Sequence, residues 1–520
     1  MALHRYSFWI FVAFLFGIAL HSFWPEARWP EIVWPILGVI CAVGVVLLGS
    51  KLRLIFFLLS VGCIGAFLFD LTIPRSSDGV FPFIGQTISI EGRVKDVGRA
   101  TQSPDFVRVD SVNRKRIHGP GHVIAVRLPN NVKSATNVRF SCSLKTLSPN
   151  TWGRASYLRR SAWTSCSGVE SLEVLPASAW DAMSLLTRWR ELLTARIHRR
   201  FAPEDAGLLA GMLYGDEELS TEARNEFRDA GLIHLIAVSG ANVTLVVSAL
   251  MPVAFIFHAT RRRAFLFASF GLLLFLGFVG ASAAVVRAGM MGWLALLARE
   301  FGRLPRPEHL MVCAAVGLCL MNPRTLAFDV GFHLSMLATW GLLAWAEPLE
   351  KRLERLPKIL GLRSALATSI AVTAALFPYA FWMFGTYSLA GLLTNMIALP
   401  LVPWIMLFGA ISVVVPDVMS DWVVLPVSGF LHLLQLLADL GARLPRMEAR
   451  KGSSWFLFAT YALMFLADRH FRYPQSRVFT RLFSVLVGTL RQRGSVKNVR
   501  EHETISSNVS FMSDTSDKNR

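Results

Sequence analysis

The chain has 520 residues, of which 53% are hydrophobic and 17% charged, and its mean hydropathy is +0.46. Soluble globular proteins average roughly 45–50% apolar and about 25% charged residues, so this composition excludes an ordinary soluble enzyme and also the fibrous, coiled-coil and disordered classes. It predicts a polytopic α-helical membrane protein. The net charge of +18 must then lie in loops and soluble parts, because membrane spans carry few charges.

Residues 1–73 are predicted to form an N-terminal membrane segment with three spans. Apolar runs cover residues 7–23, 33–48 and 54–71, and a span needs about 20 such residues. No small-x-small cleavage site ends the first run, so it is interpreted as a retained span and not a signal peptide. Arg5, Lys51 and Arg53 place the N-terminus in the cytoplasm and the residues after the third span outside.

Residues 74–180 have the period-two alternation of β-strands. Strands are expected at 87–97, 105–112, 121–128, 136–146 and 166–175, separated by polar or Gly/Pro/Asn stretches. Five short strands in about a hundred residues favour an inserted small all-β domain, an OB-like barrel. A small sandwich or an open meander is the alternative.

This insert is basic, with 15 Lys/Arg against 7 Asp/Glu. A basic, outward-facing β-domain is typical of polyanion binding, with ordinary solubilising charge as the alternative. OB-type barrels bind single strands through a basic groove and stacking aromatic rings. The DNA-binding candidates are therefore Arg93, Arg108, Lys115, Arg127 and Phe106, the last being the one aromatic residue among the first three strands.

Cys142 and Cys166 are the only cysteines of the insert. Disulfides persist in oxidising compartments, and the charge rule independently places the insert outside, so a Cys142–Cys166 disulfide is predicted. Two cysteines without CxxC spacing make a poor metal site, and no metal is expected.

The remaining chain is divided into three parts. Residues 181–230 are expected to form amphipathic and acidic helices, and 231–468 a transmembrane domain that brings the total to about 11–12 spans, some broken or re-entrant. Residues 469–520 are predicted to be a basic, disordered tail. The charge rule fails after Phe384, which leaves the side of the C-terminal tail open.

Several motifs in residues 203–444 follow one another in a defined order. They are Gly231-Leu232-x-His234-Leu235-x-Ala237-Val238-Ser239-Gly240-x-Asn242-Val243, Val286-Arg287-Ala288, Asp329-x-Gly331-Phe332-His333-Leu334-Ser335, and Asn395 followed by Ala398-Leu399-Pro400-Leu401-Val402-Pro403. This series resembles the ComEC competence family of DNA-uptake channels, with His333 where glutamine is usual.

The resemblance implies an inner-membrane channel for single-stranded DNA in natural transformation. The metallo-β-lactamase-like domain of many family members, with its HxHxDH motif, has no counterpart in these 520 residues. The resemblance therefore implies a channel without cofactors and not an enzyme. A DNA receptor, a nuclease and a cytoplasmic ATP-driven motor are expected as separate partners, beside the lipid bilayer, and a homo-oligomer is compatible with the family. No GxxxxGK[ST] P-loop occurs.

The candidate channel residues are polar groups in or next to apolar runs: His234, Ser239, Gly240, Asn242, Arg287, Asp329, His333, Ser335 and Asn395. Such groups are costly in lipid and normally face protein or water. Arg287 is expected to contact phosphate, to pair structurally with Asp329 or a helix-end carbonyl, or to extend its side chain to the outer membrane interface. Pro400 and Pro403 suggest a broken helix.

A hydrolase based on His234 and Ser239 is disfavoured, because side chains five residues apart on a helix point about 140° apart. Two other classes remain as alternatives. One is a secondary transporter or flippase for an anionic envelope substrate, which would need inverted repeats that the sequence does not show. The other is a non-transporting envelope scaffold with a polyanion-binding domain.

Overall fold

The computed structural model describes residues 2–22, 32–47, 50–73, 78–96, 104–117, 122–129, 132, 136–147, 157, 162–175, 182–215, 219–236, 238, 240–256, 258, 260–280, 283–302, 306–354, 361–388, 390–448, 457 and 459–464. One compact unit covers Met1–Gly452. The second unit covers Ser453–Arg520, and its described residues are helical. The predicted disordered tail, residues 469–520, lies outside the described residues.

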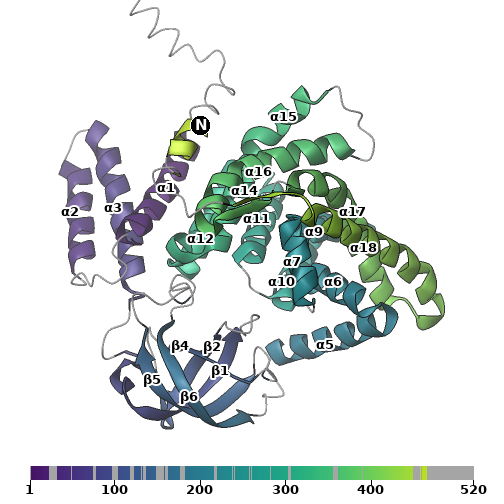
Figure 1. Cartoon of the computed structure of the whole chain (residues 1–520). Helices are drawn as coiled ribbons and strands as arrows, with labels where there is room; N and C mark the ends of the chain where they lie inside the picture. Colours follow the sequence, from purple (N-terminus) through teal and green to yellow (C-terminus); the bar gives the residue numbers. More distant parts are fainter. Residues whose placement is uncertain are drawn as a thin grey trace, which may run out of the picture. The chain divides into compact units, whose positions relative to one another are not determined.

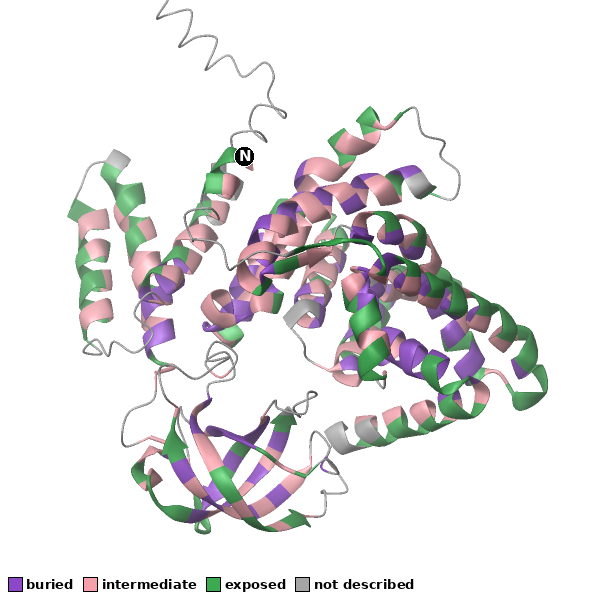
Figure 2. Cartoon of the chain, viewed as in Figure 1, coloured by how far each residue is buried: buried purple, intermediate pink, exposed green. Residues whose placement is uncertain are grey.

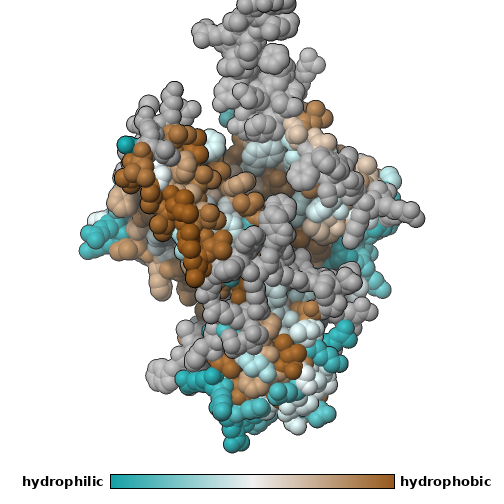
Figure 3. Space-filling view, turned by 90° about the vertical axis from the view of Figure 1, so that its left-hand side faces the viewer, coloured by the Kyte–Doolittle hydropathy of each residue, from teal (hydrophilic) through white to brown (hydrophobic). Residues whose placement is uncertain are grey.

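The first three helices are α1 (Ala2–Ser22), α2 (Val33–Leu47) and α3 (Ser50–Asp70). Glycines let α1 and α3 pack closely, because a Cβ at Gly17 would overlap the carbonyl oxygen of Gly62. His21 Nε2 lies 3.0 Å from Asp70 Oδ1, which joins the two helices at their C-terminal ends. Large apolar side chains on α2 and α3 remain exposed (Figure 3), as expected of a surface that faces lipid.

The inserted β-domain is a closed barrel (Figure 1). Its strands are β1 (Thr87–Asp96), β2 (Asp105–Val112), β3 (Lys115–Arg116), β4 (Val123–Val126), β5 (Asn137–Thr146) and β6 (Ala162–Leu175). Because β1 pairs with both β2 and β5, the ring β1–β2–β4–β6–β5 closes. All pairs are antiparallel except β4–β6. This five-stranded order confirms the predicted small barrel over the sandwich and the meander.

Alternation along the strands fills the barrel. In β5 every second side chain, from Val138 through Leu144, is buried. Ile88, Ile90 and Phe140 are among the residues that complete this core. The predicted disulfide between Cys142 and Cys166 is present and joins β5 to β6, with the two Cα atoms 5.8 Å apart.

The rest of the described chain is mostly helical. They are α5 (Ala182–Arg200), α6 (Pro203–Tyr214), α7 (Thr221–Asp229), α8 (Ile233–Ile236), α9 (Gly240–Ile256), α10 (Arg261–Val279), α11 (Ala283–Glu300), α12 (Pro307–Met321), α13 (Thr325–Phe328), α14 (Val330–Gly341), the π-helical turn Leu342–Ala346, α15 (Glu347–Arg352), α16 (Leu362–Phe384), α17 (Ala390–Val414) and α18 (Ser420–Ala442). A short sheet pairs β7 (Thr386–Ser388) with β8 (Arg446–Glu448).

Among the residues that the structure describes, five helices are long and apolar enough to cross a membrane, and four shorter helices are also apolar. Helix α17 continues through Pro400 and Pro403, so the break expected there is wrong. The buried core of this part gathers side chains from α6, α8, α17 and α18 (Figure 2), among them Leu209, Ile405 and Leu434. The result is a polytopic helical protein with an inserted β-domain.

Candidate functional site

The start of α9 carries two of the predicted channel residues. Helix α9 begins at Gly240, and the buried Asn242 lies in its first turn. Asn242 Nδ2 donates a 3.0 Å hydrogen bond to the carbonyl oxygen of Met212 near the end of α6. Asn242 therefore joins two helices, and its amide fixes the position of the α9 N-terminus.

Arg287 lies beside this N-terminus. Its side chain belongs to α11 and is only 5% exposed. A Cβ placed on Gly240 would lie 3.7 Å from Arg287 Nη2, so the guanidinium packs directly against the start of α9. Arg287 Nε and Nη1 are buried and have no hydrogen-bond partner among the described residues. Among these residues Arg287 forms no ion pair with Asp329, which was the expected alternative.

Asp329 has a structural role instead. Its carboxylate accepts hydrogen bonds from the backbone N–H groups of Gly331 (3.0 Å) and Phe332 (3.3 Å) at the start of α14. This is an N-cap, which satisfies donors that the helix itself leaves unpaired. The sequence motif around Asp329 thus marks a helix start.

His333, one turn into α14, connects three elements. Its Nε2 lies 2.6 Å from the carbonyl oxygen of Leu326, and its Nδ1 lies 2.6 Å from the hydroxyl of Tyr379 on α16. A carbonyl only accepts, so Nε2 donates to Leu326, and in the neutral ring Nδ1 accepts from Tyr379. Ser335 lies half-buried on the same helix.

Gly231 and Asn395 lie at a close approach of the chain to α17. Gly231 has a φ of +75°, and a Cβ there would come within 2.7 Å of Gly391 Cα. Asn395 lies one turn beyond Gly391, and its Oδ1 is buried without a hydrogen-bond partner in the described chain. His234 is exposed, with Nδ1 3.1 Å from the carbonyl oxygen of Gly231. Ser239 lies outside the described residues.

The predicted channel residues therefore form separate groups. Gly240, Asn242 and Arg287 come together, whereas Asp329, His333 and Ser335 share one helix start. No group of three or more His, Cys, Asp or Glu side chains suitable for a metal ion occurs among the residues that the structure describes.

The basic candidates of the β-domain lie on its outer face. Arg93 and Arg108 are directly opposite each other across β1 and β2. Arg108, Lys115 and Arg127 are exposed. The two facing guanidinium groups therefore place positive charge at one position on the sheet.

Phe106 is a correction to the sequence prediction. Its ring is 4% exposed and packs edge-on against Tyr157, with 5.6 Å between the ring centroids. Val123, Ala125 and Ala162 complete a small cluster on the opposite side of the strands from the main barrel core. Because the ring is covered, Phe106 cannot serve as an exposed platform for base stacking.

Arg324 is an important residue that the sequence did not single out. It is 1% exposed, and its guanidinium carbon lies 4.4 Å from the centre of the Trp163 ring on β6. Its Nε donates to the Thr72 hydroxyl (2.9 Å) and its Nη2 to the Thr72 carbonyl (2.7 Å). Arg324 thus links the loop after α12 to the chain that leaves α3 and to the barrel. Its only sequence signal is a lone arginine directly after Asn322-Pro323.

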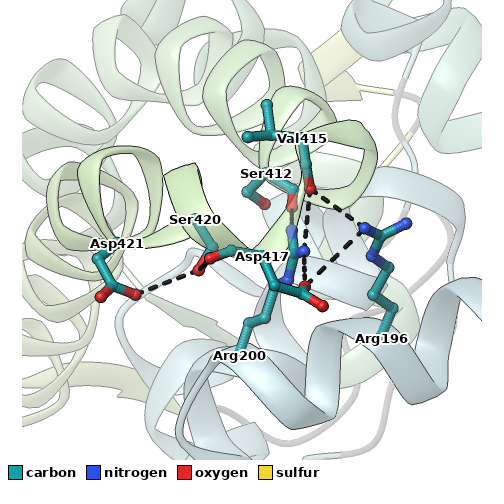
Figure 4. A network of polar contacts seen from close by, with 7 residues as sticks. All are labelled: Arg196, Arg200, Ser412, Val415, Asp417, Ser420 and Asp421. Carbon is teal, nitrogen blue, oxygen red and sulfur yellow. Dashed lines mark hydrogen bonds and ion pairs between the residues drawn. The ribbon is translucent and has the colours of Figure 1, made fainter.

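Two arginines of helix α5 attach it to its neighbours. Arg190 Nη2 donates to the carbonyl oxygen of Tyr214 at the end of α6 (2.6 Å). At the other end, Arg200 donates to the carbonyl oxygens of Ser412 and Val415 and to Asp417 (Figure 4). Helix α5 therefore connects the region after the barrel to both α6 and the α17–α18 turn.

Comparison with known proteins identifies the helical region. The model of the Competence protein family matches residues 212–469. ComE operon protein 3 of Bacillus subtilis (strain 168) is 24% identical over 211 residues, which are 40% of this chain and 26% of that protein. The chain thus matches about a quarter of the length of this relative. No solved structure matches it. This match includes α9 to α18, and residues 212–469 of the chain thus belong to the competence protein family.

Proposed function

We propose that this protein carries single-stranded DNA across the bacterial inner membrane during natural transformation. The observation that carries the proposal is where the family match lies. Residues 212–469 include four of the five long apolar helices, Arg261–Val279, Arg363–Phe384, Ala390–Val414 and Asp417–Ala442. The part shared with the competence family is the part suited to crossing a bilayer, which favours transport over a purely external scaffold.

In this proposal the β-domain lies outside and meets DNA first. The facing pair Arg93 and Arg108, with the exposed Lys115 and Arg127, offers charge to the phosphate backbone. The chain acts as a conduit and not as an enzyme. A separate receptor, a nuclease and a cytoplasmic motor supply capture, strand degradation and energy.

The test is uptake of labelled DNA in the natural host after deletion of the gene. DNA that is bound at the surface and resistant to washing should remain, whereas labelled DNA in the cytoplasm and transformants should be lost. Re-expression of the full chain should restore both. Normal cytoplasmic uptake in the deletion strain would overturn the proposal.

The barrel's part is tested separately with the full chain in lipid nanodiscs. Arg93→Gln combined with Arg108→Gln should weaken binding of a single-stranded oligonucleotide and lower the salt slope by about 0.7 for each lost phosphate contact. Lys351→Gln removes an exposed charge that is paired within α15 and serves as the control. Equal binding by all three proteins would remove this face of the barrel from the DNA path.

A further inference from the structure

The N-terminus of α9 and the Arg287 guanidinium place two positive groups side by side, an arrangement that favours binding of an anion. The first N–H groups of an α-helix have no partner within the helix and carry partial positive charge. Helix α9 is 17 residues long, and its N-terminal Gly240 lies against Arg287 Nη2. A buried cation therefore lies at the end of a helix where the dipole favours an anion.

No group in the described chain neutralises the charge of Arg287. Arg287 Nε and Nη1 are buried without hydrogen-bond partners, and no carboxylate of the described residues pairs with the side chain. Burying an unpaired charge is costly, and within apolar helices the cost is accepted where the residue has a function. Among the described side chains of this turn, the polar Asn242 already donates to the carbonyl oxygen of Met212 and supports the helix start.

The local packing also brings the guanidinium close to the start of α9. Gly240 has no side chain, and the nearest atom of the next helix to a Cβ placed there is Ala288 Cβ, at 3.4 Å. Small residues on both helices let α9 and α11 approach closely. This approach brings backbone donors and guanidinium donors to the same place.

We propose that Arg287 and the first turn of α9 bind one phosphate group of the transported strand. The guanidinium supplies a planar fork that matches two phosphate oxygens, and the helix N-terminus supplies backbone N–H groups and a favourable dipole. The inference rests on the proposed function for the source of the phosphate. The phosphate chemistry itself rests on the geometry alone.

The decisive variant is Arg287→Met, because it keeps side-chain length and removes the charge. If the charge is unpaired, this variant should be at least as stable to heat as the wild type, whereas loss of a structural ion pair would destabilise it. Cytoplasmic uptake of labelled DNA should fall roughly tenfold to a hundredfold, the range of one charge-assisted contact, with surface binding retained. Uptake by Arg287→Lys should lie between that of the wild type and that of Arg287→Met. Arg262→Met, which removes an exposed arginine from α10, should take up DNA as the wild type does.

Binding is measured on the full chain in nanodiscs with inorganic phosphate and with oligothymidylate as probes. Either probe should raise the thermal midpoint of the wild type and not that of Arg287→Met. Nanodiscs with and without anionic lipid separate the sources: a midpoint that rises with anionic lipid and no longer responds to either probe would assign the site to a lipid headgroup and overturn the strand as its ligand.

Two failures are distinguishable. If the wild type does not support uptake in its host but phosphate stabilises it through Arg287, the anion site stands and the DNA function falls. If the wild type supports uptake, and Arg287→Met and Arg287→Lys both take up DNA normally with an unchanged response to phosphate, the site is wrong. Loss of stability in Arg287→Met that Arg287→Lys restores would likewise show a structural role.

Discussion

The guanidinium of Arg324 stacks over the ring of Trp163, with its carbon 4.4 Å from the ring centre. The two residues belong to different parts of the fold, the loop after α12 and strand β6 of the barrel. The same guanidinium holds Thr72, where the chain leaves α3. One side chain therefore ties the entrance of the β-domain to the helical region.

Arg324→Ala should destabilise this junction by about 2 to 3 kcal/mol, because it removes a cation–π contact and leaves the Thr72 carbonyl without its charged donor. A double-mutant cycle with Trp163→Ala, measured by thermal unfolding of the detergent-solubilised chain, isolates the stacking contribution. Arg324→Lys keeps the charge but loses the planar fork, so it should recover only part of the loss. A coupling energy near zero would contradict the stacking contact.

The disulfide should protect β5 and β6 from opening. Cys142 and Cys166 are 24 residues apart in sequence, and closing such a loop is worth about 3 kcal/mol in the chain-entropy model. Reduction of the full chain should speed hydrogen exchange at the β5–β6 amides, measured by mass spectrometry. Cys319→Ala, which removes an unpaired buried cysteine of α12, is the control. Identical exchange with and without reductant would contradict the prediction.

The strands of the β-domain could be predicted because their pattern is local. Residues 137–146 alternate strictly, and the structure buries every second side chain of β5 up to Leu144. The prediction that Phe106 stacks on DNA bases was wrong for a physical reason. Strand β2 is covered on both faces at its start, where Phe106 packs with Tyr157 and Ala162. A period-two pattern identifies one buried face and does not reveal such a second cover.

The site residues were harder to predict, since their roles depend on partners far away in sequence. Asp329 and Arg287 are both charged residues in apolar sequence. Asp329 caps the start of α14, whereas Arg287 contacts no carboxylate in the described chain. Arg324 contacts Thr72, 252 residues away. A lone arginine at the end of a span resembles the basic residues that set membrane orientation. Sequence alone therefore does not show that Arg324 links two distant parts of the fold.

Acid should weaken the outer face of the barrel through Glu91. Arg139 Nε donates to Glu91 Oε1 (2.5 Å) and Ser111 donates to Glu91 Oε2 (3.0 Å), and these bonds, Arg139 first, lower the pKa of the Glu91 carboxyl. A lowered pKa stabilises the fold above the ordinary glutamate pKa of about 4.3, and this stabilisation is lost as the pH falls through the folded-state value.

Glu91→Gln should therefore be less stable than wild type at pH 7, and the difference should shrink below about pH 4. Thermal unfolding of the full chain across this range measures it. Glu173→Gln, which removes the more exposed of the two carboxylates that contact Arg139, should have a smaller effect. A Glu91→Gln difference that is constant with pH would show that charge is not involved.

Gly231 should resist substitution more than other glycines with positive φ. Gly231→Ala adds backbone strain and places a Cβ 2.7 Å from Gly391 Cα, where backbone cannot move aside cheaply. Gly85 has a φ of +84° with nothing within 4 Å of its added Cβ, so Gly85→Ala isolates the strain alone. We expect a loss of roughly 1 kcal/mol for Gly85→Ala and at least about 3 kcal/mol for Gly231→Ala, from thermal unfolding and cellular abundance. Equal losses would contradict the close approach.

Arg200 should hold the α17–α18 turn mainly through backbone carbonyls. It donates to the carbonyl oxygens of Ser412 and Val415 at the end of α17, where orphan carbonyls and the helix dipole favour a cation. Arg200→Ala leaves the Ser412 carbonyl without its charged donor, whereas Val415 keeps the 3.1 Å bond from Arg196, and the variant should cost about 1 to 3 kcal/mol. The side chain of Asp417, its acidic partner, is 84% exposed, so Asp417→Ala should cost less than about 1 kcal/mol. Thermal unfolding of both variants measures which loses more stability. Equal losses would show that the ion pair, and not the carbonyl contacts, fixes the turn.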